Sequence, residues 1–422
     1  MQGTTSPAAA PRVVVVGIGA DGWEAVPDRI RVTVLRAPVV VGGRRHLAML
    51  PEVPGQRREP WPSPLRAGLP ALLASLGDGA AQGGGNVVAL ASGDPLVSGI
   101  GTTLIDLLGA DAVAVVPAIS SVALARAELR WPAESCAVVS VTGSDPSLVL
   151  RELAPGRRVL VLSADERTPA QVARLLADAG YGASVLTVLG NLGSDHASTA
   201  SATAEAWQAE AEREPVPRLN VVALDLVGPR VGGWVAGLPD DAFEHDGQLT
   251  KRDLRASALA RLAPVPGEHL WDVGAGAGSV GIEWLRAHPS CSATAVEADT
   301  GRAVRITRNA ARLGVPHLRV VTGRAPEVLI DLPVPDAVFI GGGATGDGVL
   351  DACLAALRPG GRLVVHGVTL QTERLLADAY LRHGGELTRL AVETAAPLGA
   401  FTGWTPTRTV TQWAVSRSRA AS

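Results

Sequence analysis

A glycine-rich turn within residues 270–283 constrains the fold of this chain more than any other feature. The residues before the turn, 270–273, are typical of a buried strand, and helical periodicity resumes directly after it. Gly274, Gly276 and Gly278 permit positive φ values and remove the Cβ atoms that keep a ligand away from the backbone. The stretch therefore predicts a strand–turn–helix unit of the kind that binds a nucleotide.

An acidic residue follows this turn at the distance that a ribose-binding site requires. Residues 293–299 predict a second strand, and Glu297 lies roughly 20 residues past the glycines, where a carboxylate accepts hydrogen bonds from both ribose hydroxyls. Nicotinamide dinucleotide sites favour G-x-G-x-x-G, whereas the glycines here alternate as G-x-G-x-G after Asp272. That variant is more typical of S-adenosylmethionine binding. The alternative is a tight structural turn without a ligand, although such a turn needs only one or two glycines.

Length and composition limit the classes of protein to consider. A chain of 422 residues is long enough for two domains. The net charge of −3 argues against a dedicated nucleic-acid binder, and no apolar run is long and uncharged enough to span a membrane. Residues 1–11 lack the pattern of a secretory signal, and the three cysteines lie far apart and outside metal-ligand spacing. We therefore expect a cytoplasmic protein without a metal site.

The first half of the chain repeats a strand–turn–helix plan, and residues 51–64 are expected to form a loop. We expect strands at 12–16, 38–41, 86–90, 113–116, 137–141, 158–162, 183–188 and 219–224, and helices at 26–35, 122–129, 169–179 and 200–212. Residues 12–233 are therefore predicted to form one domain of two α/β lobes joined near Pro117. The segment 226–246 is the expected linker.

Several turns in this domain follow directly after predicted parallel strands. Ser92 or Asp94 can cap a following helix, Pro95 suits a first helical position, and Ser120 or Ser121 can cap the next helix. Because ligands bind at the carboxyl ends of parallel strands, these turns can line one cleft.

Four motifs of this domain together resemble the tetrapyrrole methylase family, and within it the branch that methylates C-5 of precorrin-6. They are Gly17-Ile18-Gly19, Gly42-Gly43-Arg44-Arg45-His46-Leu47, Ser92-Gly93-Asp94-Pro95 and Pro117-Ala118-Ile119-Ser120-Ser121. The resemblance implies that S-adenosylmethionine lies between the two lobes. The cofactor contacts that it implies are Gly17, Gly93, Asp94, Pro95, Ser120 and Ser121.

Residues 243–416 are predicted to form the second domain, a doubly wound parallel sheet with Rossmann-like order. Thr250 is a candidate N-cap for a helix over 251–262, and further strands are expected at 318–322, 337–340 and 362–366. Lys251, Arg252 and Arg255 can simply be the solvent-exposed cations of a helix start, which is one interpretation. The functional interpretation places Thr250 on the cofactor and these cations on an anionic substrate.

Motifs over residues 245–372 resemble the decarboxylating C-15 methyltransferases of the same corrin branch. They are Asp246-Gly247-x-x-Thr250-Lys251, Trp271-Asp272-Val273-Gly274-Ala275-Gly276, Gly323-x-Ala325-Pro326 and Phe339-Ile340-Gly341-Gly342. A fusion of the two activities implies C-methylation of a precorrin-6-type corrinoid at C-5 and C-15, with loss of the C-12 acetate as carbon dioxide, in cobalamin biosynthesis. The resemblance implies one S-adenosylmethionine site in each domain.

The resemblance and the turn pattern together give the candidate residues of the second domain. The cofactor candidates are Thr250, Asp272, Gly274, Ala275, Gly276, Ala277, Gly278, Glu297, Gly323 and Ala325. For the carboxylate-rich tetrapyrrole, the candidates across both domains are Arg44, Arg45, Lys251, Arg252, Arg255, Arg324, Gly341 and Gly342.

Two other functions remain open at this point. Fused methyltransferases that act on RNA or protein are one, and an S-adenosylmethionine-binding regulatory module is the other. The expected partner is a small tetrapyrrole rather than nucleic acid or a membrane. By analogy with related methyltransferases we also expect a homo-oligomer.

Overall fold

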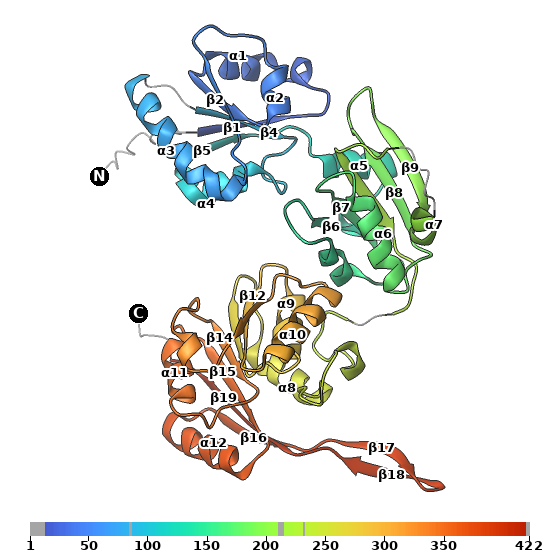
Figure 1. The fold of residues 1–422 in the computed structure, drawn as a ribbon, viewed down its shortest axis with the longest axis vertical. Helices are drawn as coiled ribbons and strands as arrows, with labels where there is room; N and C mark the ends of the chain where they lie inside the picture. Colours follow the sequence, from blue (N-terminus) through green and yellow to red (C-terminus); the bar gives the residue numbers. More distant parts are fainter. Residues whose placement is uncertain (1–12, 84–86, 210–214, 231–232, 419–422) are drawn as a thin grey trace, which may run out of the picture. The chain divides into compact units, whose positions relative to one another are not determined.

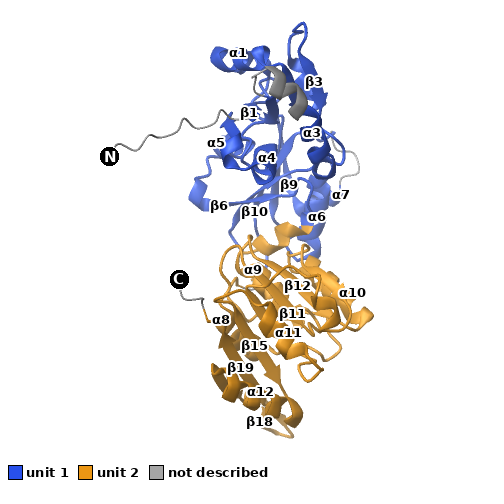
Figure 2. Cartoon of the chain, turned by 90° about the vertical axis from the view of Figure 1, so that its left-hand side faces the viewer, with its two compact units in different colours: residues 1–146, 155–229 blue, residues 147–154, 230–422 orange. Residues whose placement is uncertain are grey.

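The computed structural model describes residues 13–83, 87–209, 215–230 and 233–418 (Figure 1). The chain divides into two compact units, shown in two colours in Figure 2. Unit 1 comprises residues 1–146 and 155–229, and unit 2 comprises 147–154 and 230–422. The segment 1–11, for which no secretory signal is expected, lies outside the described residues. The domain limits 12–233 and 243–416 stay a prediction.

The first sheet of unit 1 is parallel throughout, with strand order β3-β2-β4-β1-β5. Valine side chains of β1 alternate between two apolar clusters, so that Val14 and Val16 pack on one face and Val13 and Val15 on the other. A strand buried on both faces explains the continuous β-branched run. The elements of this part are β1 (Val13–Ile18), η1 (Trp23–Ala25), α1 (Asp28–Arg36), β2 (Val39–Gly42), α2 (Arg44–Met49), β3 (Arg57–Pro60), α3 (Leu65–Gly83), β4 (Val87–Ser92), α4 (Ile100–Leu108), η2 (Ala110–Ala112) and β5 (Val113–Val116).

The second sheet of unit 1 has the order β6-β7-β10-β8-β9, and its pairs are antiparallel except for β6 with β7. Helix α5 packs on this sheet through Val122 and Ala125. Its elements are α5 (Ser121–Leu129), η3 (Ala133–Ser135), β6 (Cys136–Ser140), β7 (Arg158–Leu162), α6 (Thr168–Asp178), β8 (Val185–Gly190), β9 (Ser198–Thr203), α7 (Ala204–Ala209) and β10 (Asn220–Asp225). The helix η4 (Pro146–Glu152), between β6 and β7 in the sequence, belongs to unit 2 from Ser147 onward.

Three local predictions for unit 1 are wrong. The expected helix 200–212 is instead the end of strand β9 followed by the short helix α7, and its residues 210–212 lie outside the described residues. Hydroxyl side chains favour the strand here, since Ser201 bonds Thr187 of β8 across the pair at 2.8 Å. The expected loop 51–64 contains strand β3, and no helix begins at Pro95, because α4 starts at Ile100.

Unit 2 holds a seven-stranded sheet of order β13-β12-β11-β14-β15-β19-β16, as Figure 1 shows in yellow to red. The five strands from β13 to β15 are parallel, which confirms the predicted Rossmann-like sheet, whereas β19 runs antiparallel between β15 and β16. The strands are β11 (His269–Val273), β12 (Ser292–Glu297), β13 (Arg319–Thr322), β14 (Ala337–Ile340), β15 (Arg362–Gly367), β16 (Glu386–Leu390) and β19 (Val410–Ser416).

Helices cover both faces of this sheet, and two apolar clusters lie between them and the strands. A separate hairpin of β17 (Glu393–Leu398) and β18 (Phe401–Pro406) is inserted between β16 and β19. The helices are η5 (Asp240–Ala242), α8 (Arg252–Leu262), α9 (Ser279–Ala287), α10 (Thr300–Arg312), η6 (Glu327–Leu329), α11 (Val349–Ala356) and α12 (Leu370–His383). Lys251, rather than the predicted Thr250, is the N-cap of α8, and its side chain makes no capping bond.

Candidate active site

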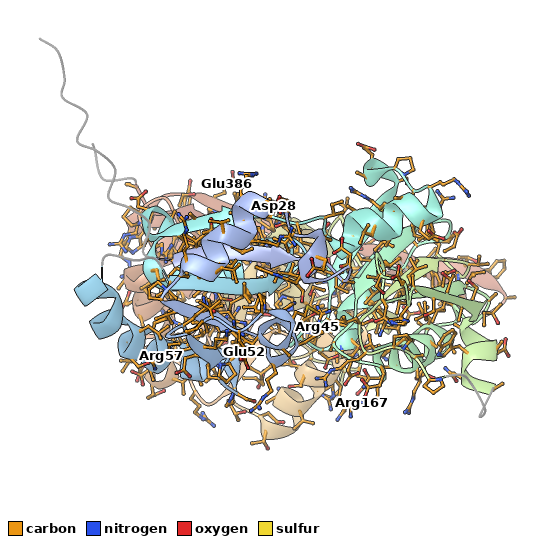
Figure 3. All side chains as sticks on the ribbon, turned by 90° about the horizontal axis from the view of Figure 1, so that it is seen from above. Asp28, Arg45, Glu52, Arg57, Arg167 and Glu386 are labelled. Carbon is orange, nitrogen blue, oxygen red and sulfur yellow. The ribbon has the colours of Figure 1, made fainter. Side chains whose placement is uncertain are left out.

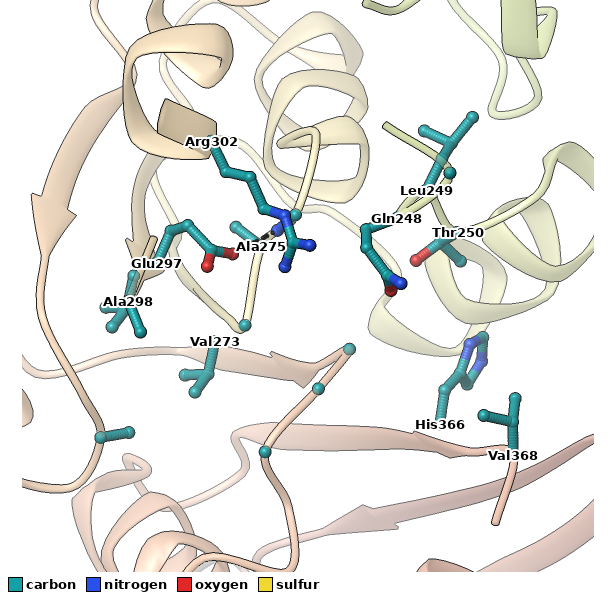
Figure 4. Close-up of a pocket in the computed structure, with 18 of the residues that line it drawn as sticks. Gln248, Leu249, Thr250, Val273, Ala275, Glu297, Ala298, Arg302, His366 and Val368 are labelled. Carbon is teal, nitrogen blue, oxygen red and sulfur yellow. Dashed lines mark hydrogen bonds between the residues drawn. The ribbon is translucent and has the colours of Figure 1, made fainter. Parts of the chain in front are cut away.

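A cavity of about 1050 Å³ opens in unit 2 where the parallel strands end (Figure 4). Glu297, Ala298 and Arg302 lie on one side of the close-up, and His366 and Val368 lie on the other. The lining residues include the predicted Thr250, Lys251, Gly274, Ala275, Gly276, Glu297, Gly323, Arg324, Ala325, Gly341 and Gly342. The topology therefore brings most of the predicted residues of unit 2 to one cavity, as expected for the carboxyl edge of a parallel sheet.

Close backbone contacts at Gly274 and Gly276 build the floor of the cavity. Both residues have positive φ, +66° and +60°. A Cβ on Gly274 would lie 2.5 Å from the carbonyl oxygen of Gly342, and one on Gly276 would lie 2.9 Å from that of Gln248. The glycines therefore let three loops meet at the carboxyl edge of β11.

Glu297 lines the cavity at the end of β12 and is nearly buried. One of its oxygens accepts a hydrogen bond from the backbone N–H of Gly276 at 2.8 Å, and the other accepts from Asp299 at 3.0 Å. A carboxylate has about four acceptor positions, so lone pairs remain for two ligand hydroxyls. Arg302, a lining residue that the sequence analysis missed, donates to Asp246 at 2.9 Å and lowers the pKa of that carboxyl.

Asp272, Ala277 and Gly278 were predicted to bind the cofactor, but the structure places them behind the turn, outside the cavity lining. Asp272 is buried, and one of its oxygens accepts from the N–H of Gly281 in α9 at 2.9 Å. Burial, with a smaller contribution from Glu297, raises the pKa of Asp272 to about 7. Ala277 is buried, and Gly278 caps α9 in a left-handed conformation. These residues hold the turn in shape.

Arg255 was predicted to face the substrate, and this prediction is wrong. Its side chain is fully buried and its Nε donates to Glu283 at 2.6 Å. Its other nitrogens donate to the backbone oxygens of Leu238 and Thr250, and its guanidinium lies 4.8 Å from the ring of Phe243. Arg255 therefore supports the loop that carries Thr250 instead of meeting a ligand.

The other two cations predicted to face the substrate, Lys251 and Arg252, differ in whether they line the cavity. Lys251 lines the cavity, with its Nζ 3.6 Å from Asp240. Arg252 is exposed and does not belong to the cavity lining.

In unit 1 the turns after β1, β4 and β5 meet. A Cβ on Gly17 would lie 2.0 Å from the carbonyl oxygen of Gly93 and 2.7 Å from the nitrogen of Ala118. The N–H of Gly93 donates to Ile18 at 2.8 Å, and that of Ala118 donates to Gly93 at 3.2 Å. These three turns therefore share one edge of the sheet, where the sequence predicts a cofactor site.

Side chains near this edge have local partners. Asp94 accepts from the N–H of Leu96, so it stabilises a turn and caps no helix. Ser120 is the N-cap of α5 and accepts from Ala123 at 3.1 Å, whereas Ser121 is the first residue of that helix. Pro95 lies in a loop before α4, and its carbonyl oxygen accepts a hydrogen bond from the N–H of Gly101 at 3.0 Å.

Both arginines of α2, Arg44 and Arg45, are exposed, and Arg45 also contacts a neighbouring histidine. Arg45, labelled in Figure 3, lies 3.0 Å from Nε2 of His46, and Ser92 lies 3.3 Å from the same atom. Burial and the charge of Arg45 lower the pKa of His46 to about 4, so the ring is neutral, and the single lone pair of Nε2 accepts from Arg45, which can only donate. His46 belongs to the motif at 42–47 but was not predicted as a site residue.

Family models match both halves of the chain. A model of tetrapyrrole (corrin/porphyrin) methylases matches residues 12–207, and a model of a precorrin methyltransferase domain matches residues 241–417. A Sinorhizobium protein named precorrin-6Y C(5,15)-methyltransferase (decarboxylating) is 42% identical over 406 residues, which cover 96% of each chain. The chain belongs to this methyltransferase family.

Other relatives match part of the chain. A Salmonella typhimurium protein named cobalt-precorrin-6B C(15)-methyltransferase (decarboxylating) is 36% identical over 157 residues, 36% of this chain and 80% of that protein. A crystal structure of the C-terminal domain of precorrin-6Y C5,15-methyltransferase from Rhodobacter capsulatus is 44% identical, with a TM-score of 0.42, and covers 44% of this chain and all of that one.

The methyltransferase structure adds lining residues that the sequence analysis missed. They include Gln248, Arg302, His366, Val368, Thr407, Arg408 and Val410. His366 ends a predicted strand, so its position at the carboxyl edge was a usable signal. Arg408 and Val410 come from the antiparallel end of the sheet, which gave no comparable signal.

Within the described residues, histidine, cysteine, aspartate and glutamate do not gather in groups of three that could hold a metal ion. None of the described helices has the length and apolar character needed to cross a bilayer.

Proposed function

We propose that this enzyme transfers methyl groups from S-adenosylmethionine to C-5 and C-15 of a precorrin-6-type tetrapyrrole and releases the C-12 acetate as carbon dioxide. C-5 methylation takes place in unit 1, and C-15 methylation with decarboxylation takes place in unit 2. The observation that carries the proposal is the cavity of unit 2, where Glu297 and the turns at Gly274 and Gly341 line one space. The relative at 42% identity supports the reaction, since its name gives both positions.

The residues at the Glu297 side of the cavity fit an adenosine group. Glu297 has free acceptor positions, and a side chain at Gly276 would crowd the loop beside it. Gly323 and Ala325 add a small-residue wall. We assign the ribose to Glu297, the adenine to the turn at Gly323–Ala325, and the methionyl part to the turn at Gly274 and to Thr250.

Among the described residues, four cations and one carboxylate, that of Glu297, line the cavity. The cations are Lys251, Arg302, Arg324 and Arg408. Arg324 and Arg408 are exposed, and guanidinium groups bind carboxylates in a bidentate manner. Because Arg302 is bonded to Asp246 and Lys251 lies near Asp240, Arg324 and Arg408 are the cations best placed to bind the carboxylates of a tetrapyrrole.

The protein has little covalent chemistry to perform in such a reaction. When bound, S-adenosylmethionine supplies a methyl group on a sulfonium that is already an activated electrophile. The residues of the chain hold the two reactants in line and exclude water. Gly341 and Gly342 lack side chains at the edge of β14, so the macrocycle can approach the cofactor closely there.

The partners and surroundings of the enzyme belong to the same proposal. We place the enzyme in the cytoplasm, acting on a small molecule rather than on nucleic acid or a membrane, and as a homo-oligomer. The hairpin β17–β18 supports self-association, because its Leu398, Phe401 and Trp404 are 68%, 80% and 72% exposed. Light scattering of a Phe401→Ser, Trp404→Ser variant tests this, with a smaller mass than wild type as the expected result.

The function is tested by incubating the pure protein with the precorrin substrate and labelled S-adenosylmethionine, followed by mass spectrometry. Gain of two labelled methyl groups with loss of carbon dioxide is the expected result. An unchanged tetrapyrrole contradicts the proposal. Labelled RNA or protein from the same incubation would instead favour the other methyltransferase function.

A further inference from the structure

His366 lies in the cavity wall on the side opposite Glu297 (Figure 4). It follows Val365, which pairs with Ile340 of β14, so it lies beside the strand end that carries Gly341. His366 is 8% exposed, and its ring makes an edge-to-face contact with Phe339 at 5.0 Å between centroids. The histidine is therefore fixed in place on the side of the cavity opposite the proposed ribose site at Glu297.

Gln412 of β19 determines which ring nitrogen of His366 carries the proton. The Gln412 amide is fully buried between His366 and Arg261. An arginine only donates hydrogen bonds, so the amide oxygen faces Arg261, at 3.0 Å from Nε and 3.3 Å from the next guanidinium nitrogen. The amide nitrogen then donates to Nε2 of His366 at 2.8 Å and to Ser257 at 3.3 Å.

With Nε2 as the acceptor, the neutral ring carries its proton on Nδ1. Burial, together with the positive charge of Arg261, lowers the pKa of His366 to about 4, so the ring is neutral at physiological pH. Within the described residues, Nδ1 has no hydrogen-bond partner. A residue that lines the cavity therefore carries an uncharged N–H donor at Nδ1.

A neutral donor suits the loss of a carboxylate better than a cation does. In the decarboxylation, the bond between the acetate methylene carbon and the carboxylate carbon breaks, and its electron pair enters the conjugated macrocycle. Carbon dioxide leaves, and the methylene carbon takes a proton from water to become a methyl group. Negative charge leaves the carboxylate in the transition state, so a cation paired with it stabilises the ground state more and slows the step. A single neutral hydrogen bond orients the group with a much smaller penalty.

We propose that His366 donates from Nδ1 to the acetate carboxylate that leaves as carbon dioxide, and that Gln412 is the positioning residue that fixes this tautomer. The inference rests on the proposed function of unit 2. The carboxylates that stay on the substrate pair with the cations that line the cavity.

Three variants of the full chain test the role of the donor. His366→Leu removes it, His366→Asn keeps a neutral N–H donor near the position of Nδ1, and His383→Leu is a control, because His383 packs on Trp413 outside the cavity lining. We expect His366→Leu to release carbon dioxide about tenfold more slowly, with His366→Asn within about threefold of wild type. Binding of S-adenosylmethionine, measured by calorimetry, should stay within about twofold of wild type in all three.

Gln412→Glu tests the tautomer without removing a side chain. A carboxylate only accepts, so Nε2 must donate, and Nδ1 becomes either a bare lone pair or part of a charged imidazolium. Both states disfavour departure of the carboxylate, so carbon dioxide release per methyl transferred should fall. Nitrogen NMR of ¹⁵N-histidine-labelled enzyme, with the His366 signal assigned by its loss in His366→Asn, should show the Nδ1–H form in wild type and a different form in Gln412→Glu.

The outcomes separate this inference from the proposed function. A wild-type enzyme that leaves the tetrapyrrole unchanged defeats the proposed function itself. If wild type is active and His366→Leu releases carbon dioxide at the wild-type rate, the role of His366 is refuted while the function stands. If His366→Leu fails to fold, the NMR spectrum of wild type tests the tautomer instead. An Nε2–H form of His366 in that spectrum overturns the inference.

Discussion

The backbone N–H of Gly276 donates to a carboxylate oxygen of Glu297 at 2.8 Å, joining two residues that lie 21 positions apart in the sequence. The bond links the glycine turn after β11 to the end of β12, its parallel neighbour. It orients the carboxylate and leaves acceptor positions for a ligand. The spacing between glycine turn and acid thus has a physical cause, since parallel strands of similar length bring their carboxyl ends together.

Replacement of Glu297 should weaken cofactor binding in unit 2 alone. Glu297→Ala removes an ionised acceptor for two hydroxyls, and hydrogen bonds to charged groups contribute about 1.5–3 kcal/mol each. We expect S-adenosylmethionine affinity at this site to fall at least tenfold, about 1.4 kcal/mol, and the site in unit 1 to keep its affinity. Calorimetry of the full chain resolves the two sites. Unchanged affinity at both would refute the assignment of Glu297.

A side chain at Gly274 should close the site by steric conflict. Gly274→Ala places its Cβ 2.5 Å from the Gly342 oxygen at a φ of +66°, so the two turns must move apart. Gly267→Ala is the matched control, because Gly267 also has a positive φ, +88°, but a Cβ there meets nothing within 4 Å. The control should cost about 1 kcal/mol of stability and keep cofactor binding, whereas Gly274→Ala should lose binding at unit 2. Equal behaviour of the two variants in calorimetry would contradict this explanation.

Arg255 should matter for stability and not for substrate recognition. Arg255→Met leaves Glu283 buried with only its backbone donors at Gly237 and Leu238, and breaking a buried pair costs about 3–5 kcal/mol. Arg252→Met, at an exposed position of the same helix, should change stability by less than about 0.5 kcal/mol. Urea unfolding followed by tryptophan fluorescence measures both. A raised KM for the tetrapyrrole with unchanged stability in Arg255→Met would restore the substrate-binding interpretation.

Asp272 should make unit 2 less stable as pH rises toward neutrality. Its pKa is raised to about 7 in the folded protein, whereas an unfolded chain has a value of about 3.9. Between these values the folded state holds a proton that the unfolded state lacks, so the contribution to stability falls with rising pH and is constant above about pH 7. Asp272→Asn removes this dependence.

The unfolding free energy of wild type should therefore fall relative to that of Asp272→Asn as pH rises. Between about pH 5 and pH 8 the difference should change by about 2 kcal/mol in favour of the variant. Denaturant unfolding at several pH values measures the difference. Asp351→Asn, on the exposed side of α11, is the control and should run parallel to wild type. A constant difference between Asp272→Asn and wild type would show that Asp272 titrates as an ordinary carboxyl.

The parallel part of unit 2 could be predicted because its signals are local. Each strand ends in a glycine or acidic turn, and one rule about parallel sheets then places Gly274, Glu297, Gly323 and Gly341 together. The antiparallel strands β16 and β19 were missed because their pairing depends on residues distant in the sequence. Arg408 and Val410, which precede and begin β19, were missed with them.

Arg255 shows how a correct element can still mislead about a side chain. A helix over 251–262 was predicted, and its cations Lys251, Arg252 and Arg255 were expected to face the substrate. The helical period turns Arg255 to the face of Leu254, Ala258 and Leu259, which is buried, whereas Arg252 stays exposed. A buried arginine needs a partner, and Glu283 on α9 could not be identified as that partner before the two helices were placed.

The central claim is that each unit carries one methyl transfer and that decarboxylation belongs to unit 2. Mass spectrometry of the tetrapyrrole product from full-length wild type and from Gly274→Ala, with labelled S-adenosylmethionine, tests it most directly. Wild type should add two labelled methyl groups and lose carbon dioxide, and Gly274→Ala should add one methyl group, at C-5, and keep the acetate. A Gly274→Ala product with two methyl groups and no acetate would contradict the claim.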